Sequence, residues 1–470
     1  MALTTLYLDL NSYFASVEQQ ERPELRGRPV GVVAVMTDTT SLLAASVESK
    51  RIGIKTGTSV RDAKRMCPSM VFVESRPRLY VEYHHRIVEA IERCIPVRGV
   101  HSIDEVSCRL QPSERNEPAA RALALSIKQS IRERIGDVVR CSIGIAPNRF
   151  LGKVGSDMMK PDGLVIIDTH ELPQRLFSLE LIDLPGIGRK MRERLDRKGI
   201  RTVEELCALS EREMEAAWES VIGRTWWHWV RGHDVPEPPT RKRSVGHQHV
   251  LPPKDRTDDR SRAICVRLLN KAASRLRHIG YGASKLSVWI RYEDPSRGAS
   301  RGFGPRATPA PPETPVGRSV AGAWGGRSAH RWASDLTLPA GSADTLTLLE
   351  AFARVWETRP RDGRTPLCVG VTLHDLAPQA DVAAALFQGE QRRMALAKAV
   401  DKLDAKYGRH TVYPASMHDA RSSGKGGIAF QSVPDLAVPD TLDDPDASDD
   451  EDEGDGPTSA AGPSHRPRRS

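Results

Sequence analysis

Three carboxylates in two short motifs are the side chains of this chain best suited to catalysis. Asp9 lies near the end of the apolar run 6–10, and Asp104 and Glu105 follow the hydrophobic segment 97–103. Because each run has the pattern of a strand, one sheet would bring the two motifs together at its edge. Carboxylate oxygens are the ligands that Mg²⁺ prefers, and three of them suit two ions that move a nucleotidyl group from a triphosphate to a hydroxyl. The motifs therefore predict a two-metal site.

A plainer interpretation exists for each motif taken alone. An aspartate at the end of a strand is usually a turn residue or a helix cap. The acidic pair Asp104-Glu105 changes the balance, because adjacent carboxylates repel each other unless a cation neutralises them. Both motifs together favour metal binding.

The size and composition are those of a globular protein with several cores. The 470 residues, 39% of them hydrophobic, correspond to about three domains. No apolar run reaches the ~18 residues of a membrane span, and the first residues lack the basic stretch and long apolar core of a signal peptide. The seven cysteines are scattered and never spaced as Cys-x-x-Cys, which argues against a disulfide framework and a zinc site. We expect a soluble, cytoplasmic protein with reduced cysteines and no membrane contact.

The charge of the chain is unevenly distributed. Residues 435–470 contain eleven acidic and three basic side chains, a net charge of −8, whereas the whole chain carries +8. Residues 1–434 therefore carry +16. This positive charge favours a polyanionic partner such as nucleic acid, although surplus lysine and arginine also occur on solvated surfaces that bind no partner. The acidic run itself has the composition of a disordered tail.

The pattern of strands and helices divides the first half of the chain into a catalytic core and a helical domain. Residues 1–170 alternate strand-like and helix-like segments, as is typical of an α/β core. The expected strands lie at 6–10, 30–35, 139–145 and 164–167, and the expected helices at 80–94 and 118–135. Residues 171–235 are helical throughout, and residues 236–243 form a proline-rich basic linker.

A second mixed domain, of α+β type, follows the linker at residues 244–376. It repeats a strand–helix–strand unit, which predicts a four-stranded sheet backed by two helices. The expected strands are 244–250, 283–292, 331–338 and 367–374, and the expected helices are 258–278 and 343–357. Residues 294–330 are rich in Gly, Pro, Ser and Arg, so we expect a disordered insertion there. A C-terminal extension at 377–434 contains one further expected helix at 390–407.

The motifs resemble those of the Y-family of translesion DNA polymerases, of the bacterial DNA polymerase IV and DNA polymerase V catalytic-subunit type. The run Asp-Leu-Asn-Ser-Tyr-Phe-Ala-Ser-Val-Glu at 9–18 resembles the first metal motif of that family, and Ser-Ile-Asp-Glu at 102–105 is its second. Further matches follow in the family's order at 53–57, 142–148, Lys153 and 156–163. The resemblance covers residues 4–415 apart from the insertion. It implies a right-hand architecture of palm, fingers, helical thumb and little finger.

By this resemblance, the metal site and the catalytic site coincide. Asp9, Asp104 and Glu105 would hold two Mg²⁺ ions, with the backbone carbonyl of Leu10 assisting and Glu105 nearest the 3′ hydroxyl of the primer. The substrates would be primer–template DNA and deoxynucleoside triphosphates. Catalysis in such a site rests mainly on positioning and charge neutralisation.

The resemblance also implies a nucleotide pocket beside the metals. Its residues are Asn11, Ser12, Tyr13, Phe14, Lys50 and Lys160. Phe14 occupies the steric-gate position, where a bulky ring beneath the incoming sugar excludes a ribose 2′ hydroxyl, although core packing is the usual fate of a phenylalanine after a strand. Lys160 matches the lysine that neutralises the triphosphate, a task for a point charge on a flexible stem.

One part of this pocket departs from the common pattern. Many members of the family have tyrosine and arginine where this chain has Val47 and Lys50. Because valine donates no hydrogen bond and lysine lacks the guanidinium fork, we expect a weaker grip on the triphosphate, or one that relies on Arg51. This stretch resembles the polymerase V branch and the Lys160 region resembles the polymerase IV branch, so the branch stays open.

A Leu-Pro-Gly-Ile-Gly turn in the helical domain is the expected contact with DNA. Such a helix-hairpin-helix turn exposes backbone amides at a helix start to a phosphate, although similar turns also simply join helices. Basic residues follow this turn directly, which favours DNA. The residues assigned to the contact are Pro185, Gly186, Ile187, Gly188, Arg189 and Lys190.

One short segment bears on protein partners. Related polymerases often carry a Gln-x-x-Leu-Phe peptide for the sliding clamp, and here Leu386 and Phe387 remain while Ala383 replaces the glutamine. The alternative is a hydrophobic anchor that packs on its own domain. Accessory mutagenesis proteins are a further class of partner that the resemblance implies.

The sequence as a whole predicts a template-directed, low-fidelity DNA polymerase that performs translesion synthesis without proofreading. One alternative is a non-catalytic relative that binds DNA and polymerases as a scaffold in a mutagenesis complex, but such relatives typically lose the metal carboxylates. Another is a nucleotide-cyclising or RNA-making enzyme on a similar palm, against which Phe14 and the little-finger-like domain argue.

Overall fold

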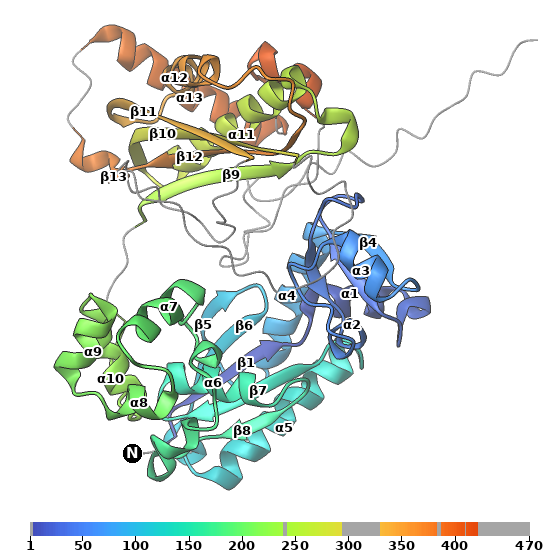
Figure 1. Cartoon of the computed structure of the whole chain (residues 1–470), viewed down its shortest axis with the longest axis vertical. Helices are drawn as coiled ribbons and strands as arrows, with labels where there is room; N and C mark the ends of the chain where they lie inside the picture. Colours follow the sequence, from blue (N-terminus) through green and yellow to red (C-terminus); the bar gives the residue numbers. More distant parts are fainter. Residues whose placement is uncertain (1–2, 238–241, 294–329, 383–386, 409, 422–470) are drawn as a thin grey trace, which may run out of the picture.

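The structure, a computed structural model, describes the chain in five stretches: 3–237, 242–293, 330–382, 387–408 and 410–421. The N-terminal core and the helical domain lie together at one end of the molecule, and the C-terminal domain lies at the other (Figure 1). The described elements follow the expected order of an α/β core, a helical domain and an α+β domain. No described helix is long and apolar enough to cross a membrane.

The core is built on a five-stranded sheet of order β5-β6-β1-β7-β8. Its strands are β1 (Thr5–Leu10), β5 (Val97–Ser102), β6 (Glu105–Arg109), β7 (Cys141–Ala146) and β8 (Leu164–Ile166). The central strand β1 runs antiparallel to both β6 and β7. Strand β6, which the sequence analysis did not predict, places Glu105 directly opposite Asp9.

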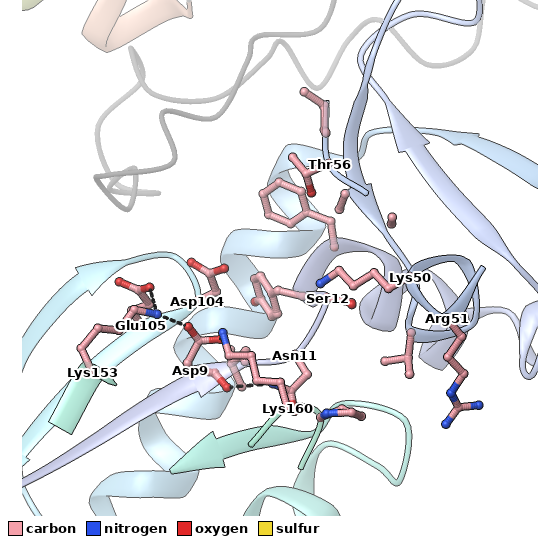
Figure 2. A pocket seen from close by; sticks show the side chains of 18 residues that line it. Asp9, Asn11, Ser12, Lys50, Arg51, Thr56, Asp104, Glu105, Lys153 and Lys160 are labelled. Atoms are coloured by element: carbon pink, nitrogen blue, oxygen red, sulfur yellow. Dashed lines mark hydrogen bonds and ion pairs between the residues drawn. The ribbon is translucent and has the colours of Figure 1, made fainter. Parts of the chain in front are cut away.

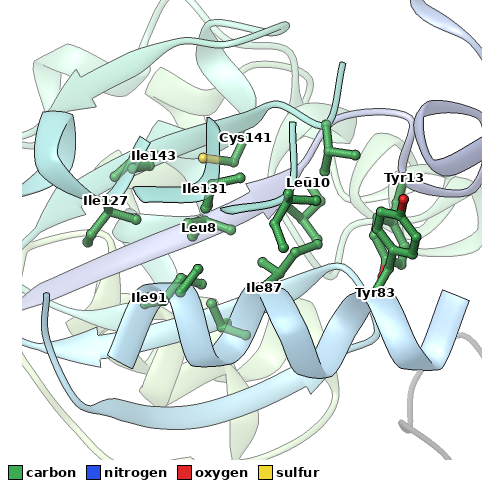
Figure 3. Packing of buried hydrophobic residues seen from close by; sticks show 14 of the residues in the cluster. Leu8, Leu10, Tyr13, Tyr83, Ile87, Ile91, Ile127, Ile131, Cys141 and Ile143 are labelled. Atoms are coloured by element: carbon green, nitrogen blue, oxygen red, sulfur yellow. The ribbon is translucent and has the colours of Figure 1, made fainter. Parts of the chain in front are cut away.

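The alternation of side chains along β1 assigns them to two faces of the sheet. Leu6, Leu8 and Leu10 lie on the face covered by α4 (Pro77–Glu92) and α5 (Glu117–Arg134). Figure 3 shows this layer, in which the leucines of β1 pack between the isoleucines of the two helices. The largest hydrophobic cluster of the core therefore covers one face of β1, and the other face remains for the site.

Helix α6 (Arg149–Met158) covers the opposite face, toward which Tyr7 and Asp9 point. It lies unusually close to β7, because a Cβ on Gly144 would lie only 2.0 Å from the carbonyl oxygen of Gly152. Glycine at this contact is what allows the close approach. As a result, side chains of α6 reach the end of β1.

A smaller sheet of order β3-β2-β4 stands beside the core. Its elements are β2 (Val30–Val33), β3 (Leu42–Ala45), β4 (Val71–Glu74), α2 (Val47–Arg51) and α3 (Val60–Met66). Helix α1 (Tyr13–Glu21) connects β1 to this sheet. The hydroxyl of Ser46 accepts a hydrogen bond from the backbone amide of Ser49 and so caps the start of α2.

The helical domain consists of four short helices. They are α7 (Arg189–Arg197), α8 (Val203–Ala208), α9 (Glu211–Trp218) and α10 (Ile222–Trp229). Capping boxes begin α8 at Thr202 and α9 at Ser210. The side-chain amide of Asn148 donates to the carbonyls of Trp229 and His233 at 2.9 and 3.0 Å, which ties the domain to the core.

The C-terminal domain confirms the prediction of a four-stranded sheet backed by two helices. The antiparallel sheet has the order β11-β10-β12-β9. Its elements are β9 (Ser244–Val250), β10 (Tyr281–Tyr292), β11 (Arg331–Ser342), β12 (Pro366–His374), α11 (Asp258–His278) and α12 (Thr345–Glu357). A short strand that was not predicted, β13 (Ala377–Pro378), pairs with the start of β10.

The expected C-terminal helix forms as α13 (Gln388–Tyr407). Ion pairs hold it to the domain: Arg277 contacts Asp401 at 2.6 Å, and Arg393 contacts Glu350 at 2.9 Å. The expected acidic tail at 435–470 and the expected insertion, apart from His330, lie outside the described residues.

Candidate active site

The three predicted metal ligands meet between β1 and β6. Asp9 and Glu105 are direct cross-strand partners, and the backbone amide of Leu10 donates to the carbonyl of Asp104 at 2.8 Å. Asp104 lies in the two-residue turn that joins β5 to β6. The pairing of these strands thus places the three carboxylates at one edge of the core sheet.

Two lysines neutralise this acidic group. The Nζ atom of Lys153, on α6, lies 2.5 Å from Asp9 Oδ2 and 2.7 Å from Glu105 Oε1 (Figure 2). The Nζ atom of Lys160 lies 2.7 Å from Asp9 Oδ1. Both lysines also contact Asp157 Oδ1, at 3.1 and 2.8 Å. Asp157 is therefore a fourth carboxylate of the site, to which the sequence analysis gave no role.

These contacts set the protonation of the groups. Burial raises the pKa of Asp9, but the ammonium groups of Lys153 and Lys160 outweigh it, so that pKa lies below its usual range. Burial lowers the pKa of Lys153, and the surrounding carboxylates raise it above its usual value. The pKa of Asp104 is raised to about 6, by burial first and then by the charges of Asp9 and Glu105. A cation beside Asp104 would favour its charged form against this burial.

The donor set fits a hard divalent ion such as Mg²⁺, because it offers only carboxylate and carbonyl oxygens. Within the described parts of the chain, no three His, Cys, Asp or Glu side chains are grouped closely enough to hold an ion. The ammonium group of Lys153 instead lies between Asp9 and Glu105. A metal that bridged these carboxylates would compete with Lys153 for them.

A cavity of about 570 Å³ lies beside the carboxylates, within the size range of small-molecule sites. It is lined by every residue predicted for the metal and nucleotide sites: Asp9, Leu10, Asn11, Ser12, Tyr13, Phe14, Lys50, Asp104, Glu105 and Lys160. The structure therefore brings the two predicted sites together in one cavity.

The part of the cavity that departs from the family pattern lies on α2. Figure 2 shows the ammonium group of Lys50 pointing toward the carboxylates and the guanidinium group of Arg51 pointing away from them. Burial, and then the positive charge of Lys160, lower the pKa of Lys50. Lys50 and Lys160 thus crowd positive charge into the cavity, which an anion would relieve.

Two of the residues predicted to bind the nucleotide form hydrogen bonds to other groups of the protein. The amide of Asn11 donates to Ser142 Oγ at 3.1 Å and accepts from the backbone amide of Asp162 at 2.7 Å. The hydroxyl of Tyr13 donates to the carbonyl of Tyr80 at 2.6 Å. These contacts fix the wall of the cavity from within the core.

Phe14 belongs to both the cavity and the core. It is only 4% exposed, and its ring stacks on that of Tyr80 with centroids 4.4 Å apart and planes inclined by 13°. The left-handed backbone of Ser12, with φ of 51°, turns the chain from β1 into α1 just before it. Phe14 thus combines core packing with a place at the cavity wall, and its role as a steric gate stays a prediction.

Three family models match the chain in sequence order. The impB/mucB/samB family model matches residues 8–157, the thumb domain model of DNA polymerase-iota matches residues 182–234, and the impB/mucB/samB family C-terminal domain model matches residues 242–386. A relative, DNA polymerase IV of Moorella thermoacetica, is 30% identical over 417 residues, which cover 87% of this chain and 95% of the relative. The chain belongs to the Y-family of DNA polymerases.

Further comparisons agree with this membership. DNA polymerase IV 1 of Bacillus subtilis is 29% identical over 293 residues, which cover 61% of this chain and 70% of that protein. A solved structure, a Y-family DNA polymerase chimera of Dbh and Dpo4, matches the fold with a TM-score of 0.58 at 21% identity, over 79% of this chain and 99% of that one. The thumb model matches the helical domain, and we name the core sheet the palm, the small sheet the fingers, the helical domain the thumb and the C-terminal domain the little finger after the parts of the Y-family architecture.

The predicted DNA-binding turn of the thumb leads into α7. Gly186 has a φ of 103°, which favours glycine, and a Cβ there would lie 3.0 Å from the ring of Trp226. Ile187 is buried in the thumb core. Four residues of the turn are exposed, namely Gly186, Gly188, Arg189 and Lys190, and Pro185 is half-buried. The turn is held by its apolar side chain and presents its polar side to solvent.

The predicted clamp segment is described only from Phe387 onward, because Ala383 and Leu386 lie outside the described residues. Phe387 precedes α13 and is 71% exposed. Phe387 therefore does not pack on its own domain, and the other residue of the expected anchor, Leu386, lies outside the described residues.

Proposed function

We propose that this Y-family polymerase performs template-directed, low-fidelity translesion synthesis with two Mg²⁺ ions and without proofreading. The convergence of Asp9, Asp104 and Glu105 beside a cavity that also contains Phe14 and Lys160 supports this best. Together these side chains supply metal ligands, a sugar contact and a phosphate contact for one nucleotidyl transfer.

In this proposal Asp9, Asp104, Glu105 and the carbonyl of Leu10 hold the ions. When held by these residues, the ions would supply positive charge beside the primer 3′ hydroxyl and the triphosphate. The pairing of β1 with β6 holds Asp9 and Glu105 opposite each other, and an ion between them would have to displace the ammonium group of Lys153.

Lys50 and Lys160 bind the triphosphate in this scheme. In the structure Lys160 forms ion pairs with Asp9 and Asp157. A triphosphate carries more negative charge than either carboxylate and would attract the same ammonium group. Because Val47 donates no hydrogen bond, the two lysines carry the phosphate contact as point charges. The weaker triphosphate grip expected from the sequence remains a prediction.

Phe14 excludes ribonucleotides in this scheme. Its ring lines the cavity, and the ring of Tyr80 lies directly against it. A 2′ hydroxyl on the incoming sugar would therefore clash with the ring of Phe14, because Tyr80 leaves that ring little space to move away.

The thumb turn supplies a contact to the DNA backbone in this proposal. The amides that follow Gly186 and the exposed Arg189 and Lys190 suit a phosphate without regard to base sequence. The net charge of +16 on residues 1–434 adds a general attraction to DNA. The sliding clamp, through Leu386 and the exposed Phe387, and accessory mutagenesis proteins are proposed further partners.

Synthesis without proofreading is proposed because the three matched family models take up most of the described chain. The three family models occupy residues 8–157, 182–234 and 242–386. Among the described residues, the stretches outside these matches form one long helix, α13, and short segments. They are too small for an exonuclease domain, since a domain usually takes at least about 50 residues.

Primer extension by the purified full chain tests the proposal. With Mg²⁺ and the four deoxynucleoside triphosphates, we expect extension on an undamaged template and insertion opposite an abasic site. DNA binding without extension on either template would instead favour the non-catalytic scaffold, although the chain retains all three carboxylates.

A further inference from the structure

Glu18 is a buried carboxylate on α1, one helical turn after Phe14. It is 0% exposed. The guanidinium group of Arg76 binds it with a fork, from Nε to Oε1 at 3.0 Å and from Nη2 to Oε2 at 2.7 Å, and the hydroxyl of Tyr80 donates to Oε1 at 2.7 Å. Burial of an ionised carboxylate is costly unless it is paired and hydrogen-bonded. Glu18 therefore binds Arg76 and Tyr80 in a fixed geometry.

Tyr80 connects this buried network to Phe14. Its ring is 0% exposed and stacks on the ring of Phe14. Its hydroxyl is held by Glu18, and its backbone carbonyl accepts the hydroxyl of Tyr13 at 2.6 Å. Both anchors come from α1, the helix that also carries Phe14. Helix α1 thus forms two hydrogen bonds with Tyr80, and the ring of Tyr80 packs against the ring of Phe14.

A side chain that excludes a single hydroxyl must be held accurately. The 2′ oxygen is one atom, so a retreat of the Phe14 ring by a fraction of its own thickness would admit it, and sites of this kind need their parts placed within ~0.5 Å. Packing of Phe14 against a loosely held ring would not give that accuracy. The hydrogen bond from Tyr80 to Glu18 removes this freedom.

We propose that Glu18 and Tyr80 are positioning residues that fix the ring of Phe14 and so determine how strictly this polymerase rejects ribonucleotides. The inference rests on the proposed role of Phe14 as the sugar gate. Neither residue lines the catalytic cavity, so both act through Phe14 and not on the nucleotide.

The substitution Tyr80→Phe keeps the stacked ring and removes only the hydroxyl that Glu18 holds. We expect kcat/KM for a ribonucleotide to rise about tenfold relative to that for the matching deoxynucleotide, as the loss of one hydrogen bond to a charged group allows. The kcat/KM for the deoxynucleotide itself should change less than about twofold, because its sugar does not press on the gate. Single-nucleotide insertion by the full chain, with Mg²⁺, measures both values.

Glu18→Gln tests the other end of the same bond. Because both substitutions disturb one contact, the double variant should discriminate no worse than the more affected single variant. Tyr83→Phe is the matched control: Tyr83 also lies on α4 and donates to Glu21 at the end of α1, one turn further from Phe14. It should leave sugar selection unchanged.

Phe14→Ala in the same assay separates the two ways of failing. If Phe14→Ala raises ribonucleotide use and Tyr80→Phe does not, the gate stands and the positioning role is wrong. If Phe14→Ala leaves sugar selection unchanged, the gate is wrong and the positioning role falls with it. A Tyr80→Phe variant that loses both activities equally, or a Tyr83→Phe variant that relaxes selection as much, would also overturn the proposal.

Discussion

Single side chains set the charge of the active site, and Lys153 is the one that bridges Asp9 and Glu105. Methionine there would remove the ammonium group between these carboxylates, and Asp9 would keep only its contact with Lys160. We expect Lys153→Met to lower the free energy of unfolding by about 2 kcal/mol when metal is chelated, less than the cost of a fully buried pair because Lys153 is partly exposed. Added Mg²⁺ should stabilise this variant more than the unmodified protein. Thermal melting with EDTA and with MgCl₂ measures both effects.

Lys128→Met provides the control for this prediction. Its Nζ atom pairs with Asp162 Oδ1 at 2.6 Å, and its side chain is 13% exposed against 18% for Lys153. Because Lys128 does not touch the catalytic carboxylates in the described contacts, its loss should reduce stability without adding a response to Mg²⁺. An equal response to Mg²⁺ in both variants would show that Lys153 and the ions do not share ligands.

At the scale of elements, the contact between β7 and α6 determines whether Lys153 reaches the carboxylates at all. A Cβ on Gly144 would meet the backbone of Gly152 at 2.0 Å, so Gly144→Ala must push α6 away from the sheet. We expect a loss of about 3 kcal/mol in the free energy of unfolding, together with a loss of primer extension. Chemical denaturation and an extension assay measure the two.

Gly99→Ala on β5 is the companion variant, because the nearest atom to its added Cβ lies at 3.4 Å, an ordinary contact distance. It should change stability by less than about 1 kcal/mol. If Gly144→Ala is as stable as Gly99→Ala, the close approach of α6 does not depend on glycine.

Elements with strong local signals were predictable from the sequence, and long-range contacts were not. Helix α11 was expected at 258–278 and forms over those residues, because Thr257 caps it and its apolar positions repeat regularly. Strand β6 was missed because its five residues, starting at Glu105, are too short to show a clear alternation. The contact between Lys153 and Asp9 joins residues 144 positions apart and depends on the glycine at the α6 contact. No local pattern carries that information.

At the scale of the whole molecule, the catalytic site and the main features that favour DNA are separate. The net charge of +16 is spread over residues 1–434, and the thumb turn around Gly186 is distinct from the residues that line the catalytic cavity. Removal of two carboxylates makes the palm less acidic and leaves these features in place. We therefore expect that catalysis and DNA binding can be lost independently.

Primer extension by a variant carrying both Asp104→Ala and Glu105→Ala shows whether these carboxylates hold the catalytic ions. We expect the extension rate to fall at least about a thousandfold, while affinity for primer–template DNA is retained or increased. A variant with Glu133→Ala and Asp137→Ala, two exposed carboxylates at the end of α5, should extend at the normal rate. Extension at full rate by the Asp104 and Glu105 variant would contradict the assignment of these carboxylates to the metal site.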